Sequence, residues 1–219
     1  VGCGDATSLI QTGRAITVSC AEGDSGYVYA EELPFSVETL DVYDMKKPVT
    51  RMMLNLANPE MAFEASQLPV DGVGLARIEF IINNSIRVHP RALLDHAKLA
   101  PALQKEISAI ISGYPDAASY YVKKLAEGIA TIAAAFYPRQ VIVRFSDFKS
   151  NEYASLVGGE LYEPKEENPM LGFRGAYRYP SDAFRACFAL ECEAIIKVRK
   201  HMGLNNVDVM IPFARSVQE

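Results

Sequence analysis

The chain has 219 residues, and its hydrophobic fraction of 49% and charged fraction of 22% are typical of a globular protein with one full domain or parts of two. The net charge of −5 argues against a nucleic-acid surface, which needs a basic stripe. No apolar run reaches the roughly 18 residues of a membrane helix, so we expect neither nucleic acid nor a membrane as a partner.

The four cysteines are Cys3, Cys20, Cys187 and Cys192. They form no CxxC pair, and no histidine lies at a zinc-like spacing from them. Free thiols are typical of a reducing compartment, which favours a cytoplasmic location. Nothing in the spacing of the four residues indicates a catalytic thiol or a metal site.

Residues 1–45 are predicted to form a region separate from residues 46–219. Residues 14–19 and 26–30 read as two short strands, and the turn signal Gly23-Asp24-Ser25-Gly26 between them predicts a hairpin. A lone hairpin is not stable, so we expect it to be the tail of a domain whose body lies upstream. The mixed, acidic stretch 31–49 is interpreted as a linker, with the boundary near residue 46.

Strands and helices alternate in residues 46–219. The predicted strands are 52–56, a short run within 71–80, 141–145 and 207–211, and the predicted helices run from Asn58 to about Gln67, near 101–112, near 118–136, and from Ser181 to about Met202. Four strand–helix units predict an α/β fold with parallel strands, equal to half of an eight-unit barrel. The apolar last strand would be an open edge, and Val1 is not an initiator Met, so we expect a piece of a larger protein.

Two predicted strands end on an arginine, Arg77 and Arg144. Side chains at the carboxyl ends of parallel strands line the ligand site, and a guanidinium group suits carboxylate or phosphate. We therefore expect one anionic ligand held from two sides. The alternatives are that Arg77 pairs with a neighbour such as Glu79, and that Arg144 is exposed at its strand end.

The loop after the third strand exceeds twenty residues, and loops of this length are usually functional. It contains Arg174 between two glycines, either as a further anion contact or as a partner of Glu166 or Glu167. Lys149, Ser150 and Asn151 are interpreted as a polar, exposed turn. We do not expect catalysis from the three histidines, which are His89, His96 and His201.

Four motifs carry a family resemblance: GVGLARIEF at 72–80, VIVRFSDFKSNEY at 141–153, ENPMLGFRG at 167–175 and FALECE at 188–193. Together they resemble the barrel domain of the phosphoenolpyruvate-utilising enzymes. The resemblance implies the N-terminal half of a (β/α)8 TIM barrel that binds phosphoenolpyruvate and pyruvate, preceded by the β-rich tail of a swivelling phosphohistidine domain. It also implies that Arg77, Arg144 and Arg174 bind substrate and that this chain contains no catalytic residue and no metal ligand.

The activity implied by the resemblance is phosphoryl transfer from ATP, through a phosphohistidine, to pyruvate, with AMP and phosphate as the other products. ATP would bind an upstream domain, Mg²⁺ would be held by residues outside this chain, and the protein would form a homodimer. The chain alone would be inactive, because the histidine, the metal carboxylates and the proton donor lie elsewhere. The alternatives are a pyruvate phosphate dikinase, Enzyme I of the sugar phosphotransferase system, or a non-catalytic anion-binding barrel.

Overall fold

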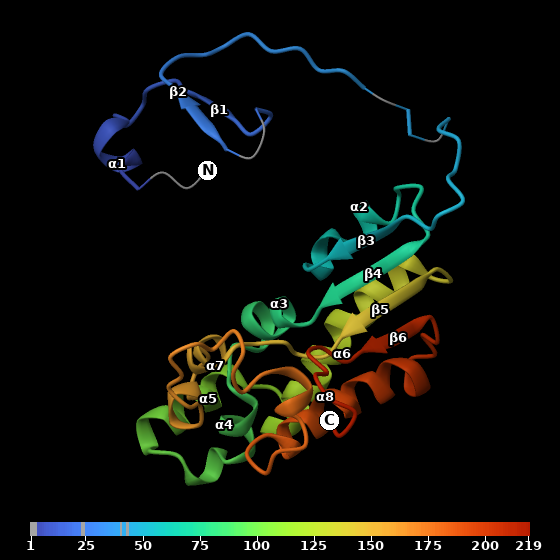
Figure 1. Cartoon of the computed structure of the whole chain (residues 1–219). Helices are drawn as coiled ribbons and strands as arrows, with labels where there is room; N and C mark the ends of the chain where they lie inside the picture. Colours follow the sequence, from blue (N-terminus) through green and yellow to red (C-terminus); the bar gives the residue numbers. More distant parts are fainter. Residues whose placement is uncertain (1–3, 23–24, 40, 43) are drawn as a thin grey trace. The chain divides into compact units, whose positions relative to one another are not determined.

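The computed structural model describes residues 4–22, 25–39, 41–42 and 44–219 (Figure 1). The chain folds as two compact units, Val1–Asp44 and Met45–Glu219. No helix in the described ranges is long and apolar enough to cross a membrane.

The first unit contains the predicted hairpin in a shorter form. Strand β1 (Thr17–Ser19) pairs antiparallel with β2 (Tyr27–Tyr29). A one-turn helix that the sequence did not predict, α1 (Ala6–Leu9), precedes them. Two of the predicted turn residues, Gly23 and Asp24, and the thiol of Cys3 lie outside the described residues.

A four-stranded parallel sheet organises the second unit. Its strands lie in chain order: β3 (Met53–Leu56), β4 (Gly72–Arg77), β5 (Gln140–Arg144) and β6 (Val207–Met210). Figure 1 shows their arrowheads pointing the same way, toward the end of the sheet where α3 and α7 lie. All four strands of the second unit that were predicted from the sequence are therefore confirmed, with ends that differ by a residue or two.

The helical segments of the second unit occupy the connections between these strands. They are η1 (Pro59–Met61), α2 (Ala62–Ala65), α3 (Glu79–Ile81), η2 (Ile82–Ile86), α4 (Pro90–Leu94), η3 (His96–Lys98), α5 (Pro101–Ile110), α6 (Ala117–Phe136), α7 (Ser150–Ala154), η4 (Gly159–Leu161), η5 (Gly175–Tyr177), α8 (Arg185–Ile196) and η6 (Lys197–His201). Segments η2 and η6 are π-helical. The larger predicted helices are confirmed, although the one that begins after Asn58 ends at Ala65.

The sheet has one buried face and one open face. On β5, Val141 and Val143 are fully buried, whereas Ile142 and Arg144 alternate with them and are half-buried. Helix α6 packs on β4 and β5. The residues that continue the open face, such as Asp208 and Met210 on β6, are exposed, so no layer of the second unit, as far as its residues are described, covers this face.

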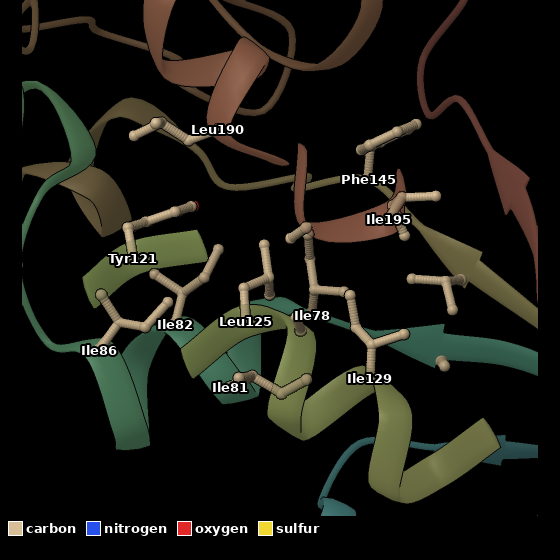
Figure 2. Close-up of a cluster of buried hydrophobic side chains, with 14 of the residues drawn as sticks. Ile78, Ile81, Ile82, Ile86, Tyr121, Leu125, Ile129, Phe145, Leu190 and Ile195 are labelled. Carbon is tan, nitrogen blue, oxygen red and sulfur yellow. The ribbon is translucent and has the colours of Figure 1, made fainter. Parts of the chain in front are cut away.

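Helix α6 supplies most of the core against that sheet (Figure 2). Its predicted inward residues, Tyr121, Leu125, Ile129, Ile132 and Phe136, are all buried. In Figure 2, Tyr121, Leu125 and Ile129 lie beside a run of isoleucines that extends from the end of β4 through η2, and Phe145 and Leu190 belong to the same cluster. The 3.6-residue period of α6 therefore predicted its core face correctly.

Two local expectations were wrong, and one group of short helical segments was not predicted. Ser181 does not cap α8, which begins at Arg185; its hydroxyl instead donates to the Arg178 carbonyl. The stretch 149–151 is not an exposed turn, because Ser150 begins α7 and is buried. The short helical segments between Glu79 and Lys98 were not predicted, since segments of three to five residues carry too little periodicity to recognise.

We predict that Leu125→Ala lowers the free energy of unfolding by about 3 kcal/mol, because it leaves a cavity in a fully buried position. Urea unfolding followed by circular dichroism measures the change. Leu68→Ala is the matched control, since Leu68 is 43% exposed and its truncation should cost well under half as much. Equal losses in the two variants would contradict the core described here.

Candidate functional site

The site begins with the register of β4 and β5. Arg77 and Arg144 are paired positions on these neighbouring parallel strands, so both side chains leave the carboxyl end of the sheet at the same level. Val73 and Ala76 on β4 and Val143 on β5 are buried in the core, and β4 begins at Gly72. Gly72 has a φ of +147°, and a side chain there would clash with the Gln140 carbonyl.

Arg144 is held by two carboxylates. Its Nη2 donates to Oε1 of Glu79 at 2.8 Å, and its Nη1 lies 3.1 Å from Oδ2 of Asp147. The same Glu79 oxygen accepts the Asp147 backbone N–H at 2.7 Å. Glu79 is therefore the partner of Arg144 rather than of Arg77, contrary to the structural alternative that the sequence allowed for Arg77.

Arg174 reaches the same place from the long loop after β5. Its Nε donates to Oδ1 of Asp147 at 2.8 Å and its Nη2 to Oδ2 at 3.2 Å, which is the paired geometry that favours Arg. Its guanidinium also lies 4.2 Å from the centre of the Phe213 ring. Arg174 thus pairs with neither Glu166 nor Glu167; Glu166 instead accepts the Phe173 N–H and the Ser150 hydroxyl.

Arg77 keeps its charge unpaired. Within the described part of the chain no carboxylate forms an ion pair with it, and its guanidinium lies 5.0 Å from the centre of the Phe80 ring. Its buried Nε has no hydrogen-bond partner, and neither has Nε of Arg144 nor Oε2 of Glu79. Buried polar atoms are normally paired, and an anion could accept hydrogen bonds from the two guanidinium nitrogens, whereas Oε2 of Glu79 would need a donor or a cation.

The cluster therefore has a net positive charge. Three guanidinium groups, from Arg77, Arg144 and Arg174, surround two carboxylates, from Glu79 and Asp147. Asp147 is buried and Arg144 and Arg174 are mostly so, which limits screening by water. Chemically, this arrangement can bind a small anion with phosphate or carboxylate groups.

A second buried charge cluster, which sequence reasoning missed, anchors the loop that carries Arg174. The guanidinium of Arg178 is fully buried and binds both oxygens of Glu163 at 2.6 Å. The ring of His89 contacts the same carboxylate through Nε2 at 3.0 Å. Phe173, Tyr153 and Phe184 present their rings to Arg178. In the sequence, the only sign of this cluster was a second arginine, Arg178, close to Arg174. Its burial could not be predicted, because tertiary packing decides it.

The other candidate groups lie away from the arginine cluster. His96 contacts the Gln104 carbonyl, and His201 is exposed at the end of η6. The described cysteines are free thiols, and burial raises the pKa of Cys187 to about 12, which makes it a poor nucleophile. No group of three or more His, Cys, Asp or Glu in the described ranges could hold a metal ion.

Comparison with known sequences gives the class of the protein. The model of the family described as "PEP-utilising enzyme, PEP-binding domain" matches residues 35–219. The chain therefore belongs to the phosphoenolpyruvate-utilising enzymes, as its motifs had suggested.

Several curated proteins with similar sequences are phosphoenolpyruvate synthases. Phosphoenolpyruvate synthase of Escherichia coli K12 is 61% identical over the whole chain, and that of Pseudomonas aeruginosa UCBPP-PA14 is 57% identical. Phosphoenolpyruvate synthase of Aquifex aeolicus VF5 is 48% identical, again with the whole chain covered. The chain spans 28% of the length of the first two relatives and 31% of the third.

We predict that Glu163→Gln lowers the free energy of unfolding at neutral pH by about 3–5 kcal/mol, because it leaves the buried Arg178 charge without its carboxylate. Burial by itself raises the pKa of Glu163, but hydrogen bonds from Arg178 and His89 outweigh it and the pKa is lowered. The carboxylate therefore stabilises the fold above its ordinary pKa of about 4.5, and this contribution is lost as the pH falls through the lowered value.

Denaturant unfolding at several pH values tests this prediction. The gap between wild type and Glu163→Gln should be largest near neutral pH and should shrink under acid conditions. Glu160→Gln is the control, since Glu160 is exposed on the neighbouring segment and should change little. A Glu163→Gln variant as stable as the control would show that the cluster does not anchor the loop.

Proposed function

We propose that this chain supplies the first half of the phosphoenolpyruvate- and pyruvate-binding (β/α)8 barrel of a phosphoenolpyruvate synthase. Four parallel strands in chain order, of which β3, β4 and β5 are each followed by helices, support the barrel. Residues 1–45 would be the tail of the swivelling phosphohistidine domain and the linker, and residues 46–219 the barrel. The names of the relatives support the choice of enzyme.

The proposed reaction transfers a phosphoryl group from ATP, through a phosphohistidine, to pyruvate. In the last step the P–N bond to the histidine breaks and a P–O bond to the enolate oxygen of pyruvate forms, giving phosphoenolpyruvate. Water takes up the other phosphoryl group of ATP, so AMP and phosphate are the remaining products. ATP and the histidine would belong to other parts of the protein. We also propose a cytoplasmic, homodimeric enzyme that binds neither nucleic acid nor membrane.

The observation that carries this proposal is the register that brings Arg77 and Arg144 side by side. Two adjacent guanidinium groups can hold the phosphate of phosphoenolpyruvate and neutralise the charge that develops on the enolate. Arg174, fixed by Asp147, would contact the same anion from the loop side. Because Arg144 and Arg174 are already held by carboxylates, they need little reorganisation when the ligand arrives.

Mg²⁺ is part of the proposed reaction, but the residues described here do not fit it. Of the two acids in the cluster, Asp147 binds Arg144 and Arg174, and Glu79 binds Arg144 through Oε1; among the described residues this leaves Oε2 of Glu79 as the one oxygen of these two acids without a partner, which is too few for a metal site. Mg²⁺ requires oxygen ligands in near-octahedral geometry. We therefore expect its ligands from outside this chain.

We predict that Arg77→Met and Arg144→Met, each made in the full-length gene product, weaken phosphoenolpyruvate binding by about 100-fold, or roughly 3 kcal/mol, because each removes a charge-assisted contact. Turnover should fall by at least as much. Isothermal titration and steady-state kinetics measure these effects.

The two variants should differ in stability. Arg77→Met should melt near the wild-type temperature, since Arg77 has no ion pair in the described part of the chain, whereas Arg144→Met leaves Glu79 and Asp147 short of a partner. Arg185→Met serves as the control, because the Arg185 side chain is 71% exposed on α8. Near-normal binding in both site variants would rule out the proposed site.

We further predict that the full-length gene product releases phosphate from ATP and pyruvate without added inorganic phosphate or a carrier protein. A coupled assay for phosphoenolpyruvate and phosphate measures it. A strict requirement for inorganic phosphate would instead favour a pyruvate phosphate dikinase, and a requirement for a carrier protein would favour an Enzyme I. Binding of phosphoenolpyruvate with no turnover under any of these conditions would favour a non-catalytic barrel.

A further inference from the structure

The turn after β5 is held through the residue that precedes Asp147. Every polar group of Ser146 is bonded: its backbone N–H donates to Oε2 of Glu191 at 3.1 Å, and its hydroxyl donates to Oε1 at 2.5 Å. The Ser146 hydroxyl accepts from Tyr153 at 2.7 Å, and its carbonyl accepts from Tyr179 at 2.8 Å. Ser146 is therefore the point at which α8 and α7 are tied to the turn.

The next amide in the turn is held in the same manner. The Asp147 N–H donates to Oε1 of Glu79, so two successive backbone amides bind two carboxylates from different helices. Glu191 lies on α8 and Glu79 on α3. Between them, these carboxylates fix the backbone from which Asp147 binds both Arg144 and Arg174.

Glu191 differs from Glu79 in having no cationic partner. It is fully buried, and no Lys, Arg or His in the described ranges forms an ion pair with it. The titratable and charged groups that face it are Glu79 from α3, Tyr121 from α6, Tyr153 from α7, Arg178 and Tyr179 from the loop, and Cys187 and Cys192 from its own helix. Burial raises the pKa of Glu191 to about 7, and the hydrogen bonds from Ser146 offset part of that rise.

A carboxylate in such a place does not stabilise the fold. Because its pKa is raised, the folded protein binds the proton more tightly than the unfolded chain, so stability falls as the pH rises from about 4.5 to about 7. Unpaired buried charges are costly, and a neutral residue of the same shape should be tolerated at least as well. Because stability does not account for an acid at position 191, its hydrogen bonds with Ser146 in the turn are the feature that does.

We propose that Glu191 is a positioning residue for the anion site, whose ionised carboxylate holds the amide and hydroxyl of Ser146 and thereby keeps Asp147 where it binds Arg144 and Arg174. This inference rests on the proposed function, since it assigns a role in binding the same anion. When Glu191 takes up a proton, the Ser146 hydroxyl and the new carboxyl O–H compete for one short hydrogen bond. Oε2 still accepts the Ser146 N–H, so the anchor that Glu191 gives the turn is weakened.

The test compares Glu191→Gln with Glu193→Gln in the full-length gene product, in buffer that contains Mg²⁺. Glu193 is exposed two residues further along α8, so the control makes the same chemical change outside the network. At pH 8 we expect Glu191→Gln to bind phosphoenolpyruvate about tenfold more weakly than wild type while melting at the same or a higher temperature. Isothermal titration and differential scanning calorimetry provide the two readouts, and Glu193→Gln should match wild type in both.

Two further arms complete the test. Ser146→Ala removes the hydroxyl anchor and should weaken binding several-fold; it decides the question if Glu191→Gln does not fold. Pyruvate, whose carboxylate stays ionised, is titrated between pH 5.5 and 8.5. We expect the wild-type affinity for pyruvate to fall below about pH 7 and the affinity of Glu191→Gln to stay flat over the same range.

The outcomes separate this inference from the proposed function. Normal phosphoenolpyruvate affinity in Glu191→Gln, alongside a large loss in Arg144→Met, would overturn the positioning role and leave the site intact. A parallel loss of stability and affinity in Glu191→Gln would also overturn it, because Glu191 would then be a structural residue. A wild-type protein that binds neither phosphoenolpyruvate nor pyruvate would refute the proposed function itself.

Discussion

The arrangement of the site depends on one buried carboxylate, that of Asp147. It binds Arg144, which comes from a strand, and Arg174, which comes from a loop 27 residues further along the chain. Without the Asp147 carboxylate, the guanidinium groups of Arg144 and Arg174 would repel each other, because both are mostly buried and water screens their charges poorly. With it, they converge on the carboxyl end of the sheet beside Arg77, and the cluster retains a positive charge for an anion.

The contacts around Asp147 hold the proposed binding site rigid, although burying their charged and polar groups lowers the stability of the fold. Glu191 and Glu79 hold the two successive amides of the turn, and the Arg178–Glu163–His89 cluster anchors the loop. Each of these contacts buries charge or polar groups that an apolar core would avoid. Their common result is that side chains from α3, β5, α8 and the long loop keep a single geometry around the cluster, which is what preorganised binding of a charged ligand requires.

Sequence reasoning found the arginines but not the groups that hold them. Arg77 and Arg144 stood out because each ends an apolar strand, and the family motifs drew attention to Arg174. Asp147 and Glu191 lie inside the motifs at 141–153 and 188–193, but no role was assigned to them, since an aspartate in a turn and a glutamate on a helix are both ordinary surface residues. Glu79 lies two positions after Arg77, which made a pairing of the two an alternative, but the Glu79 side chain binds Arg144 on the neighbouring strand.

The sequence by itself determined the parallel α/β class, the four strands and the core face of α6, because these follow from hydrophobic periodicity and short-range signals. The family followed from four long motifs. Only the tertiary structure decided which acid holds which arginine, where α8 begins and that Ser150 is buried. These features depend on strand register and on contacts between residues tens of positions apart, and such contacts leave no periodic trace in the chain.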